Sequence, residues 1–293
     1  MSLASPNDLI SGLVTGVPTS AGTFTFTVQV SDSTNAKASS MFSLMIVQVP
    51  VISANGIMNA ASYAAGGVAP GEMITIFGSG LGPATLAPMQ TDDRGYVSTS
   101  LGGTQVLFDG TPAPLIYSLA GQVSAIVPYE TFGKSSTQVQ VAFQGQSSST
   151  VSIPVVTAMP GLFTLDSSGR GPGAIVNQDG TVNLATNPAS AGSIVMIFAT
   201  GEGQTHPDGT DGKPDGFQAP TPVAQPVTAT LGGLNADVQY IGAVPGLVAG
   251  FLQVNVRVPS GVPASSAVPV ILSIGGTSSQ AKVTLAVGPP SVQ

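Results

Sequence analysis

Acidic side chains gather at one point of the sequence in a way that suits a hard metal ion. Asp208, Asp211 and Asp215 lie in one short segment with glycine after each of them. Carboxylate oxygens are the ligands that Ca²⁺ prefers, and glycine lets a loop wrap tightly around the ion. The spacing differs from that of an EF-hand, and Lys213 stands among the acids. We keep two interpretations, a calcium site and a solvated acidic loop, and expect no other cofactor.

Other chemistry would need partners that the chain does not supply in a recognisable pattern. His206 is the only histidine, and no nucleophile elbow or cysteine accompanies it, so neither a Ser-His-Asp triad nor a transition-metal site is expected. Glycoside hydrolysis needs two carboxylates at one cleft. The three glutamates, Glu72, Glu130 and Glu202, have no tryptophan platform in the chain. We predict no catalytic residue and no enzyme activity.

The sequence contains one pattern twice. GEMITIFGSGLG at residues 71–82 and GSIVMIFATGEG at residues 192–203 superimpose without a gap, and QVSAIVP from Gln122 corresponds to QVNVRVP from Gln253. A repeat of this length indicates two copies of one domain. Shared residues are expected to be scaffold. We therefore expect a specific site where the copies differ.

The shared residues receive structural interpretations. The glycines after each repeated strand, at residues 78–82 and 201–203, superficially suggest a phosphate loop, but no helix follows them. A turn with positive φ is the favoured interpretation. Gln122 and Gln253 are predicted to be buried amides that tie down a neighbouring loop.

Two loops of unequal length follow the shared glycines, at residues 83–100 and 204–226. Loops on a rigid scaffold usually carry binding specificity. Tyr96 is our best candidate for a ligand contact, followed by Asp92, Asp93 and His206. The first loop has a weaker claim to calcium than the second.

Composition excludes several classes of partner. Only 7% of residues are charged, and the seven basic residues are dispersed singly, so a nucleic-acid surface is excluded. No apolar run reaches the roughly 20 residues that span a bilayer. With 37 glycines, 24 prolines and no cysteine, the chain has the composition of an extracellular β-protein without disulfides. No signal peptide is evident at the start.

Alternating apolar and polar residues predict antiparallel strands. The segment TFTFTVQV at 23–30 is one, and 41–49 is its return strand after a turn at 31–35. The first copy is predicted to have strands at 73–77, 105–108, 115–117, 123–127, 137–143 and 150–156. The second copy is predicted to have strands at 194–199, 227–231, 237–241, 251–258, 268–274 and 281–287.

We therefore predict an all-β fold of tandem Ig-like antiparallel β-sandwiches. The expected domains are a partial Ig-like hairpin at 1–50, copy one at 51–157 and copy two at 158–293. The connection at 158–163 is short and apolar rather than rich in Gly and Ser, so the copies are expected to pack on each other.

Two segments resemble known families. GVPTSAGTFTFTVQVSDS, within residues 12–49, resembles the C-terminal half of the Ig domains of bacterial surface proteins. NAASYAAGGVAPGEMITIFGSGLG, MPGLFT, NPASAGSIVMIFATGEG and FLQVNVRVP, spread over residues 56–287, resemble the Solibacter-type C-terminal domain of acidobacterial secreted proteins. That resemblance implies a C-terminal module on large exported proteins and no particular activity.

These observations predict a non-catalytic stalk, spacer or adhesion element of an extracellular or cell-surface bacterial protein. Its expected partners are other domains of the same parent protein. A carbohydrate-binding or targeting module of an exported enzyme is the alternative, with extracellular polysaccharide as partner. A further alternative is strand exchange with a neighbouring protein through the exposed edges of the N-terminal hairpin. Oligomeric state stays open.

Overall fold

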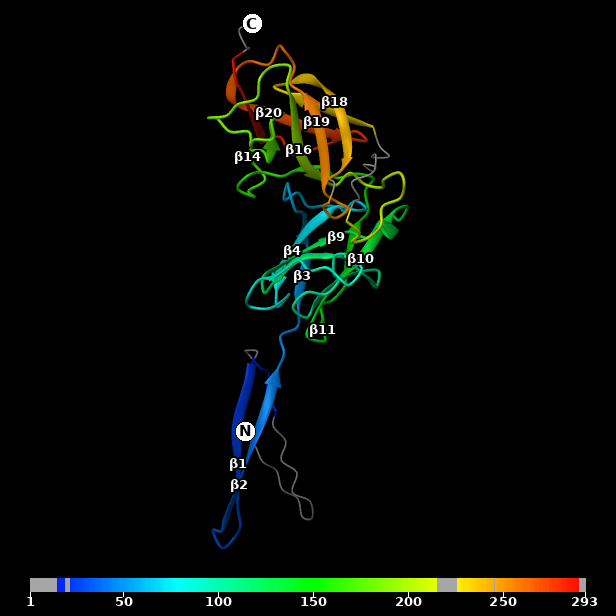
Figure 1. The fold of residues 1–293 in the computed structure, drawn as a ribbon. Coiled ribbons are helices and arrows are strands. Elements are labelled where there is room, and N and C mark those ends of the chain that lie inside the picture. The colour runs from blue at the N-terminus through cyan, green and yellow to red at the C-terminus, as the bar shows by residue number, and fades with distance from the viewer. Residues whose placement is uncertain (1–14, 19–21, 215–225, 245, 290–293) are drawn as a thin grey trace. The chain divides into compact units, whose positions relative to one another are not determined.

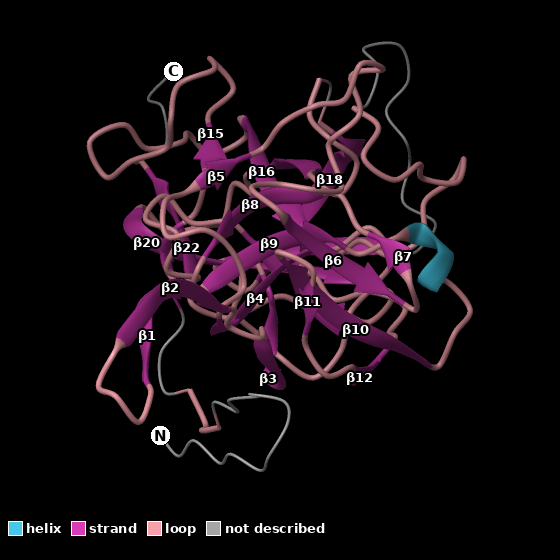
Figure 2. Cartoon of the chain, turned by 90° about the horizontal axis from the view of Figure 1, so that it is seen from below, coloured by secondary structure: helices cyan, strands magenta, loops and turns pink. Residues whose placement is uncertain are grey.

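The computed structural model describes residues 15–18, 22–214, 226–244 and 246–289, and it divides into two compact units, Met1–Val49 and Pro50–Gln293. Strands and loops make up nearly all of the described chain (Figure 2). Within these residues the one helical element is a single 3-10 turn, η1, at Tyr129–Thr131.

The first unit contains an antiparallel hairpin of β1 (Gly22–Ser31) and β2 (Lys37–Ile46). Asp32 closes its turn, because its Oδ1 accepts bonds from the backbone nitrogens of Thr34 and Ala36 at 2.8 and 3.0 Å. This tight turn starts the return strand earlier than the predicted residue 41. The hairpin was otherwise predicted from its alternation.

Copy one is a sandwich of two sheets around one core (Figure 1). One sheet holds β3 (Val51–Asn59), β4 (Met73–Ser79), β9 (Gln122–Ile126), β8 (Leu115–Leu119) and β5 (Ala87–Pro88). The other holds β11 (Gln146–Ser147), β10 (Ser136–Phe143), β6 (Thr104–Phe108), β7 (Thr111–Pro112) and β12 (Val151–Pro154). Ile74, Val106 and Val123 are fully buried between them.

Copy two has its own core, which includes Val195, Val254 and Leu272. Its main strands are β16 (Ile194–Thr200), β17 (Val227–Leu231), β18 (Leu234–Ala243), β19 (Leu252–Arg257), β20 (Ser265–Ile274) and β22 (Val283–Val287). Short strands complete it: β13 (Gly161–Leu162), β14 (Gly171–Pro172), β15 (Ile175–Val176) and β21 (Thr277–Ser278). Each strand predicted for the two copies overlaps one of these elements.

The two copies share one strand register. Phe77 lies opposite Gln122 in copy one, and Phe198 lies opposite Gln253 in copy two. The sheets of copy two are continuous because β18 pairs with both β17 and β19. In copy one the same stretch is split into β7 and β8 around Pro114, which has no backbone donor for a ladder.

Three of the repeated glycines have the predicted positive φ, whereas Gly78 lies within β4. Gly80, Gly201 and Gly203 all have positive φ, near 67°, 86° and 81°. A side chain on Gly201 or Gly203 would also collide with the backbone carbonyl of Met159 or Thr157. The glycine run is therefore required by the fold and not by a phosphate.

The prediction for the repeated glutamines was wrong. Gln122 and Gln253 are only half-buried, on the outer face of their sheets. The Gln253 amide donates to Asn255 Oδ1 at 2.9 Å, a neighbour on the same strand and not a loop carbonyl. Recurrence in both copies reflects a shared strand position rather than a buried bond.

Candidate functional site

The candidate site is the junction, by which we mean the contact between copy one and copy two within residues 51–289. Donors of copy one bond to acceptors of copy two across it. Asn59 Nδ2 donates to the Met159 carbonyl at 2.9 Å, and the Met73 nitrogen donates to Thr200 Oγ1 at 2.8 Å. These bonds join the end of β3 and the start of β4 in copy one to copy two.

Tyr129 is the main anchor of the junction. Its side chain is only 7% exposed, and its ring fits between Gly71 of copy one and Gly209 of copy two. A Cβ on Gly71 or Gly209 would come too close to the Tyr129 side chain for a real contact. The absence of a side chain at both positions is therefore what admits the ring.

The two unequal loops meet at the same contact. The Val97 nitrogen, in the first loop, donates to the Gly212 carbonyl of the second at 2.7 Å. Val97 also packs in a small buried cluster with Ile126 and Val248. Both loops were expected to carry a ligand site. They therefore also form part of the contact between the two copies.

A pair of glutamates is buried at the junction. Glu72 is fully buried, and its carboxyl oxygens accept bonds from Asn59 Nδ2 at 2.9 Å and from the Ala69 nitrogen at 2.7 Å. Burial raises the pKa of Glu72 to about 8, and the charge of Glu202 adds to that increase. Glu202 is 3% exposed. Glu72 is therefore largely protonated at neutral pH.

The space beside Glu202 has no room for a sugar. It is a void of about 10 Å³ that Tyr129 and Thr205 also line. A water molecule needs about that much, so at most one fits. The aligned repeats place Ser193 opposite Glu72 and Leu81 opposite Glu202, so both glutamates are among the residues that differ between the copies. This alignment could not show that the two meet.

The three predicted calcium ligands are placed as follows. Asp208 Oδ1 accepts a bond from Gln204 Nε2 at 2.9 Å, and Asp211 Oδ1 accepts one from the Tyr129 nitrogen at 2.9 Å. Asp215 lies outside the described residues. Within the described ranges no group of three or more His, Cys, Asp or Glu side chains could hold a metal ion. The calcium site stays a prediction, which thermal melts with calcium and with chelator test.

Asp211 is instead part of the junction. Burial, together with the neighbouring Glu130 of copy one, raises its pKa to about 7. A carboxyl in this position can hold its proton near neutral pH while it still accepts the bond from the backbone of copy one.

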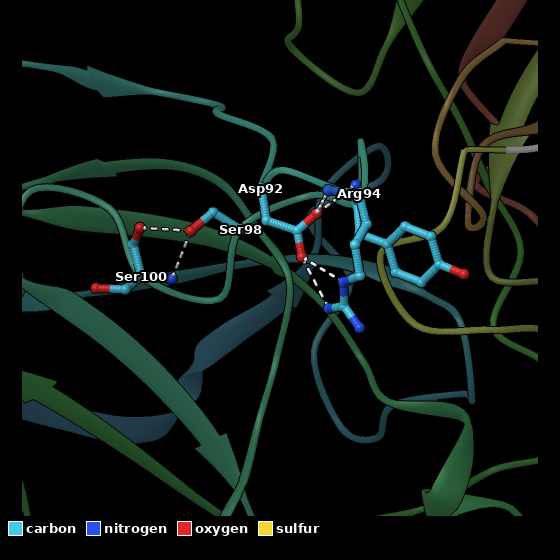
Figure 3. Close-up of polar contacts among 5 residues, drawn as sticks. Asp92, Arg94, Ser98 and Ser100 are labelled. Atoms are coloured by element: carbon cyan, nitrogen blue, oxygen red, sulfur yellow. Dashed lines mark hydrogen bonds and ion pairs between the residues drawn. The ribbon is translucent and has the colours of Figure 1, made fainter.

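The first loop presents an exposed ion pair. Asp92 Oδ2 accepts bonds from Arg94 Nε and the Arg94 terminal nitrogen at 3.0 and 2.8 Å (Figure 3). The Arg94 guanidinium holds the pKa of Asp92 below its ordinary value. The same guanidinium lies over the Tyr96 ring, 4.8 Å from its centre, and Tyr96 is half-buried.

Ligand binding by this loop stays a prediction, with one ring face of Tyr96 already covered by Arg94. Asp93 is exposed beside the pair. His206 is exposed on the second loop and precedes a cis proline, Pro207. Tyr96 and Asp93 thus belong to the first loop and His206 to the second.

Comparisons with known proteins agree with this architecture. Residues 1–47 match the family model described as "Putative Ig domain", and residues 60–154 match the IPT/TIG domain. No curated protein matches the sequence. The finer resemblance to the Solibacter-type family rests on the sequence motifs alone.

Solved structures show only distant likeness. One is the Bacteroides ovatus mixed-linkage glucan utilization locus protein SGBP-B in complex with a mixed-linkage heptasaccharide, with 11% identity and a TM-score of 0.33. The match covers 91% of this chain and 53% of that one, so this chain spans about half its length. The endo-fucoidan hydrolase MfFcnA4 from glycoside hydrolase family 107 has 12% identity and a TM-score of 0.20, over 94% of this chain and 35% of that one.

Among the described residues no helix has the length and apolar character needed to cross a membrane. Strand content, sheet pairing and the two family matches agree on the architecture. The chain is an all-β protein of tandem Ig-like β-sandwiches, similar to a putative Ig domain over residues 1–47 and to the IPT/TIG domain over residues 60–154.

Proposed function

We propose that this chain is a non-catalytic structural and interaction module, a stalk, spacer or adhesion element of a larger secreted or cell-surface bacterial protein. Ig-like and IPT/TIG domains are typical of such modules. The observation that carries the proposal is the junction, because it holds two sandwiches in one fixed arrangement, which is the property a spacer needs.

Several independent contacts support a rigid junction. Beyond the bonds of Asn59 and Thr200, Tyr63 Oη donates to the Ser167 carbonyl at 2.8 Å. Gln280 Nε2 of copy two reaches the Ala61 carbonyl of copy one at 3.4 Å. A hinge would have to break these bonds together with the packing around Tyr129, which disfavours free swinging.

Spin labels test this rigidity. The chain has no cysteine, so Ser152→Cys on β12 and Ser266→Cys on β20, both exposed, give unique attachment points in the full chain. We expect a narrow distribution of distances between the labels, and a broader one when Tyr129→Ala is added. A broad distribution in the unaltered junction would contradict the spacer role.

Catalysis by the purified chain would also contradict the proposal. The informative result would be turnover of a polysaccharide or peptide that is lost on substitution of one named acid, such as Glu130→Gln. Glu130 is the exposed member of the three glutamates, so the substitution leaves the buried pair at the junction intact.

A second role, strand exchange with a neighbouring chain, is favoured by the hairpin. Met41, Met45 and Phe42 on β2 are 74%, 68% and 49% exposed. Within the described residues of this unit the sheet has two strands, so these apolar side chains and both strand edges are available for pairing. Light scattering that shows concentration-dependent dimers, reduced by Met45→Lys, would support exchange. A strict monomer at all concentrations would oppose it.

A further inference from the structure

A hollow of about 170 Å³ lies where copy two covers part of the first sheet of copy one. Its floor is the outer face of that sheet. Thr75 on β4 and Tyr117 on β8 both lie opposite Ser124 on β9. Their neighbours Ile74 and Val123 point into the core, so these three side chains face away from it. Phe163 and Thr164 of copy two form part of the wall.

The lining selects a neutral ligand. Aromatic rings of Tyr63, Tyr117 and Phe163 line the hollow with hydroxyl groups of serine and threonine, and none of the lining residues carries a charge. Aromatic faces pack on the apolar face of a sugar ring, while hydroxyl groups bond to its edge. A phosphate or a carboxylate would find no cation there.

Two hydroxyl groups in the hollow have little to bond to within the protein. Tyr117 Oη and Thr75 Oγ1 are 3.5 Å apart. Good O–H···O bonds are about 2.5–3.0 Å long, so this contact uses little of either group's capacity. The third hydroxyl of the floor is used, because Ser124 Oγ donates to the Ile74 carbonyl at 2.9 Å.

The repeat supplies an internal reference for Tyr117. Copy two has Tyr240 at the corresponding place, since a bulge follows Leu115 in β8 and Val238 in β18, just before the two tyrosines. Tyr240 Oη donates to the Ala243 carbonyl at 2.9 Å. The phenol is thus well bonded to backbone in copy two and left for another partner in copy one.

The rim of the hollow is held in an uncommon backbone conformation. Tyr63 has φ near 57°, which side chains of this size rarely adopt. Its nitrogen donates to the Asn59 carbonyl at 2.9 Å, and its Oη donates to the Ser167 carbonyl of copy two. Its ring remains 37% exposed at the edge of the hollow. Strain of this kind is typical of ligand sites.

We propose that this hollow binds one neutral sugar residue, with the aromatic rings against its apolar face and the hydroxyls of Tyr117 and Thr75 bonded to its own. The hollow is more than ten times the roughly 10–15 Å³ that a single water requires, which gives room for a sugar ring. The rest of a glycan would extend into solvent. This site goes beyond the structural role proposed above, which stands if no sugar binds.

The test measures binding to the full chain by calorimetry and by saturation-transfer NMR. The probes are glucose, galactose, xylose and N-acetylglucosamine, the trisaccharides of glucose and xylose, and glucuronic acid as a charged comparison. We expect at least one neutral probe to bind with a Kd in the millimolar range, about what one ring and two hydrogen bonds supply. A trisaccharide should bind at most about tenfold tighter than its monosaccharide.

Matched variants locate the site. Tyr117→Phe and Thr75→Val keep the shape of the floor, and each should weaken the Kd by about threefold to tenfold. Tyr240→Phe removes the same atom from copy two and should leave the Kd unchanged. Thermal melts of all three check that the fold is kept.

Three results would overturn the site. One is the absence of binding by every neutral probe at about 10 mM. Another is an equal loss of sugar affinity in Tyr117→Phe and Tyr240→Phe, or no loss of affinity in Tyr117→Phe and Thr75→Val. The third is a preference for glucuronic acid over glucose. The spin-label distances do not depend on a ligand, so these failures are distinct from failure of the spacer role.

Discussion

Copy one and copy two fold alike but are placed differently. Their strands share one register, and their glycine turns coincide. They differ at positions where one member of the pair lies at the junction. These pairs, with copy one first, are Glu72 and Ser193, Ser79 and Thr200, Leu81 and Glu202, and Tyr129 and Ser260.

The difference follows from the geometry of the contact. Two identical domains that meet head to tail use two different surfaces, so each copy needs its own residues. Copy one contributes the outer face of a sheet and Tyr129, whereas copy two contributes loops and the Thr200 hydroxyl. Divergence between the copies therefore marks the surface at which they join as well as any surface that binds a ligand.

The largest effect is expected from removal of the anchor. Tyr129→Ala deletes a buried aromatic ring between two glycines, so the free energy of unfolding should fall by about 3–5 kcal/mol. Ser260→Ala at the corresponding, exposed position of copy two should have almost no effect. Scanning calorimetry measures both.

The same calorimetric traces report on cooperation between the copies. If Tyr129 joins them, its loss should separate one transition into two. Equal destabilisation by Tyr129→Ala and Ser260→Ala would show that the copies are not distinguished by the junction.

The next largest effect is a dependence of the free energy of unfolding on pH, which arises mainly from Glu72 of copy one. Burial raises the pKa of Glu72 from 4.5 to about 8, so between these values the folded chain holds a proton that the unfolded chain has lost. Stability should therefore fall as pH rises from about 4.5 to about 8, and level off above it. Asp211, with its pKa raised to about 7, changes stability in the same direction.

Denaturant titrations across this range should show a loss on the order of 2–4 kcal/mol between pH 5 and 8. Glu72→Gln should flatten most of that slope and stabilise the chain at pH 8. Asp93→Asn, on an exposed carboxyl, is the control and should leave the slope unchanged. A rise in stability over this range would mean that Glu72 is ionised when folded.

The residues of the junction show which features of the structure can be predicted from the sequence and which cannot. Alternation and turn residues predicted the strands because a side chain's face on a strand depends on its own sequence position. The same rule cannot say which outer face another domain covers. Glu72 and Tyr129 could thus be seen to differ from Ser193 and Ser260, but their meeting with Glu202 and Gly209 depends on the relative placement of two folded domains.

The hollow could not be predicted from the sequence either, because it depends on how the two copies pack on each other. Tyr63, Tyr117 and Phe163 are distant in sequence, and only the packing of copy two on copy one brings them together. The expected contact residue, Tyr96, was chosen because it is a tyrosine in a loop that differs between the copies. Loop length predicts variability, whereas enclosure by two domains predicts a cavity.

A smaller effect is expected from one hydrogen bond of the junction. Thr200→Val keeps the shape of the side chain but leaves the Met73 nitrogen without its acceptor, at a cost of about 1–3 kcal/mol. Ser79→Ala is the matched change in copy one. Ser79 is exposed, so the change should stay within about 0.5 kcal/mol. If urea titrations gave equal changes in the free energy of unfolding for the two substitutions, the Thr200 hydrogen bond would not stabilise the junction.

The smallest effect on stability is expected from Arg94, an exposed residue of the first loop. Arg94→Ala removes an ion pair with Asp92 and the contact with the Tyr96 ring, but its side chain is 74% exposed. Exposed pairs of this kind add little because water and salt screen them, so Tm should change by no more than about 1 °C. Val97→Ala in the same loop removes a buried side chain of the junction cluster and should lower Tm by more than that. If Arg94→Ala were the more destabilising change, the loop would be held by its exposed charges rather than by copy two.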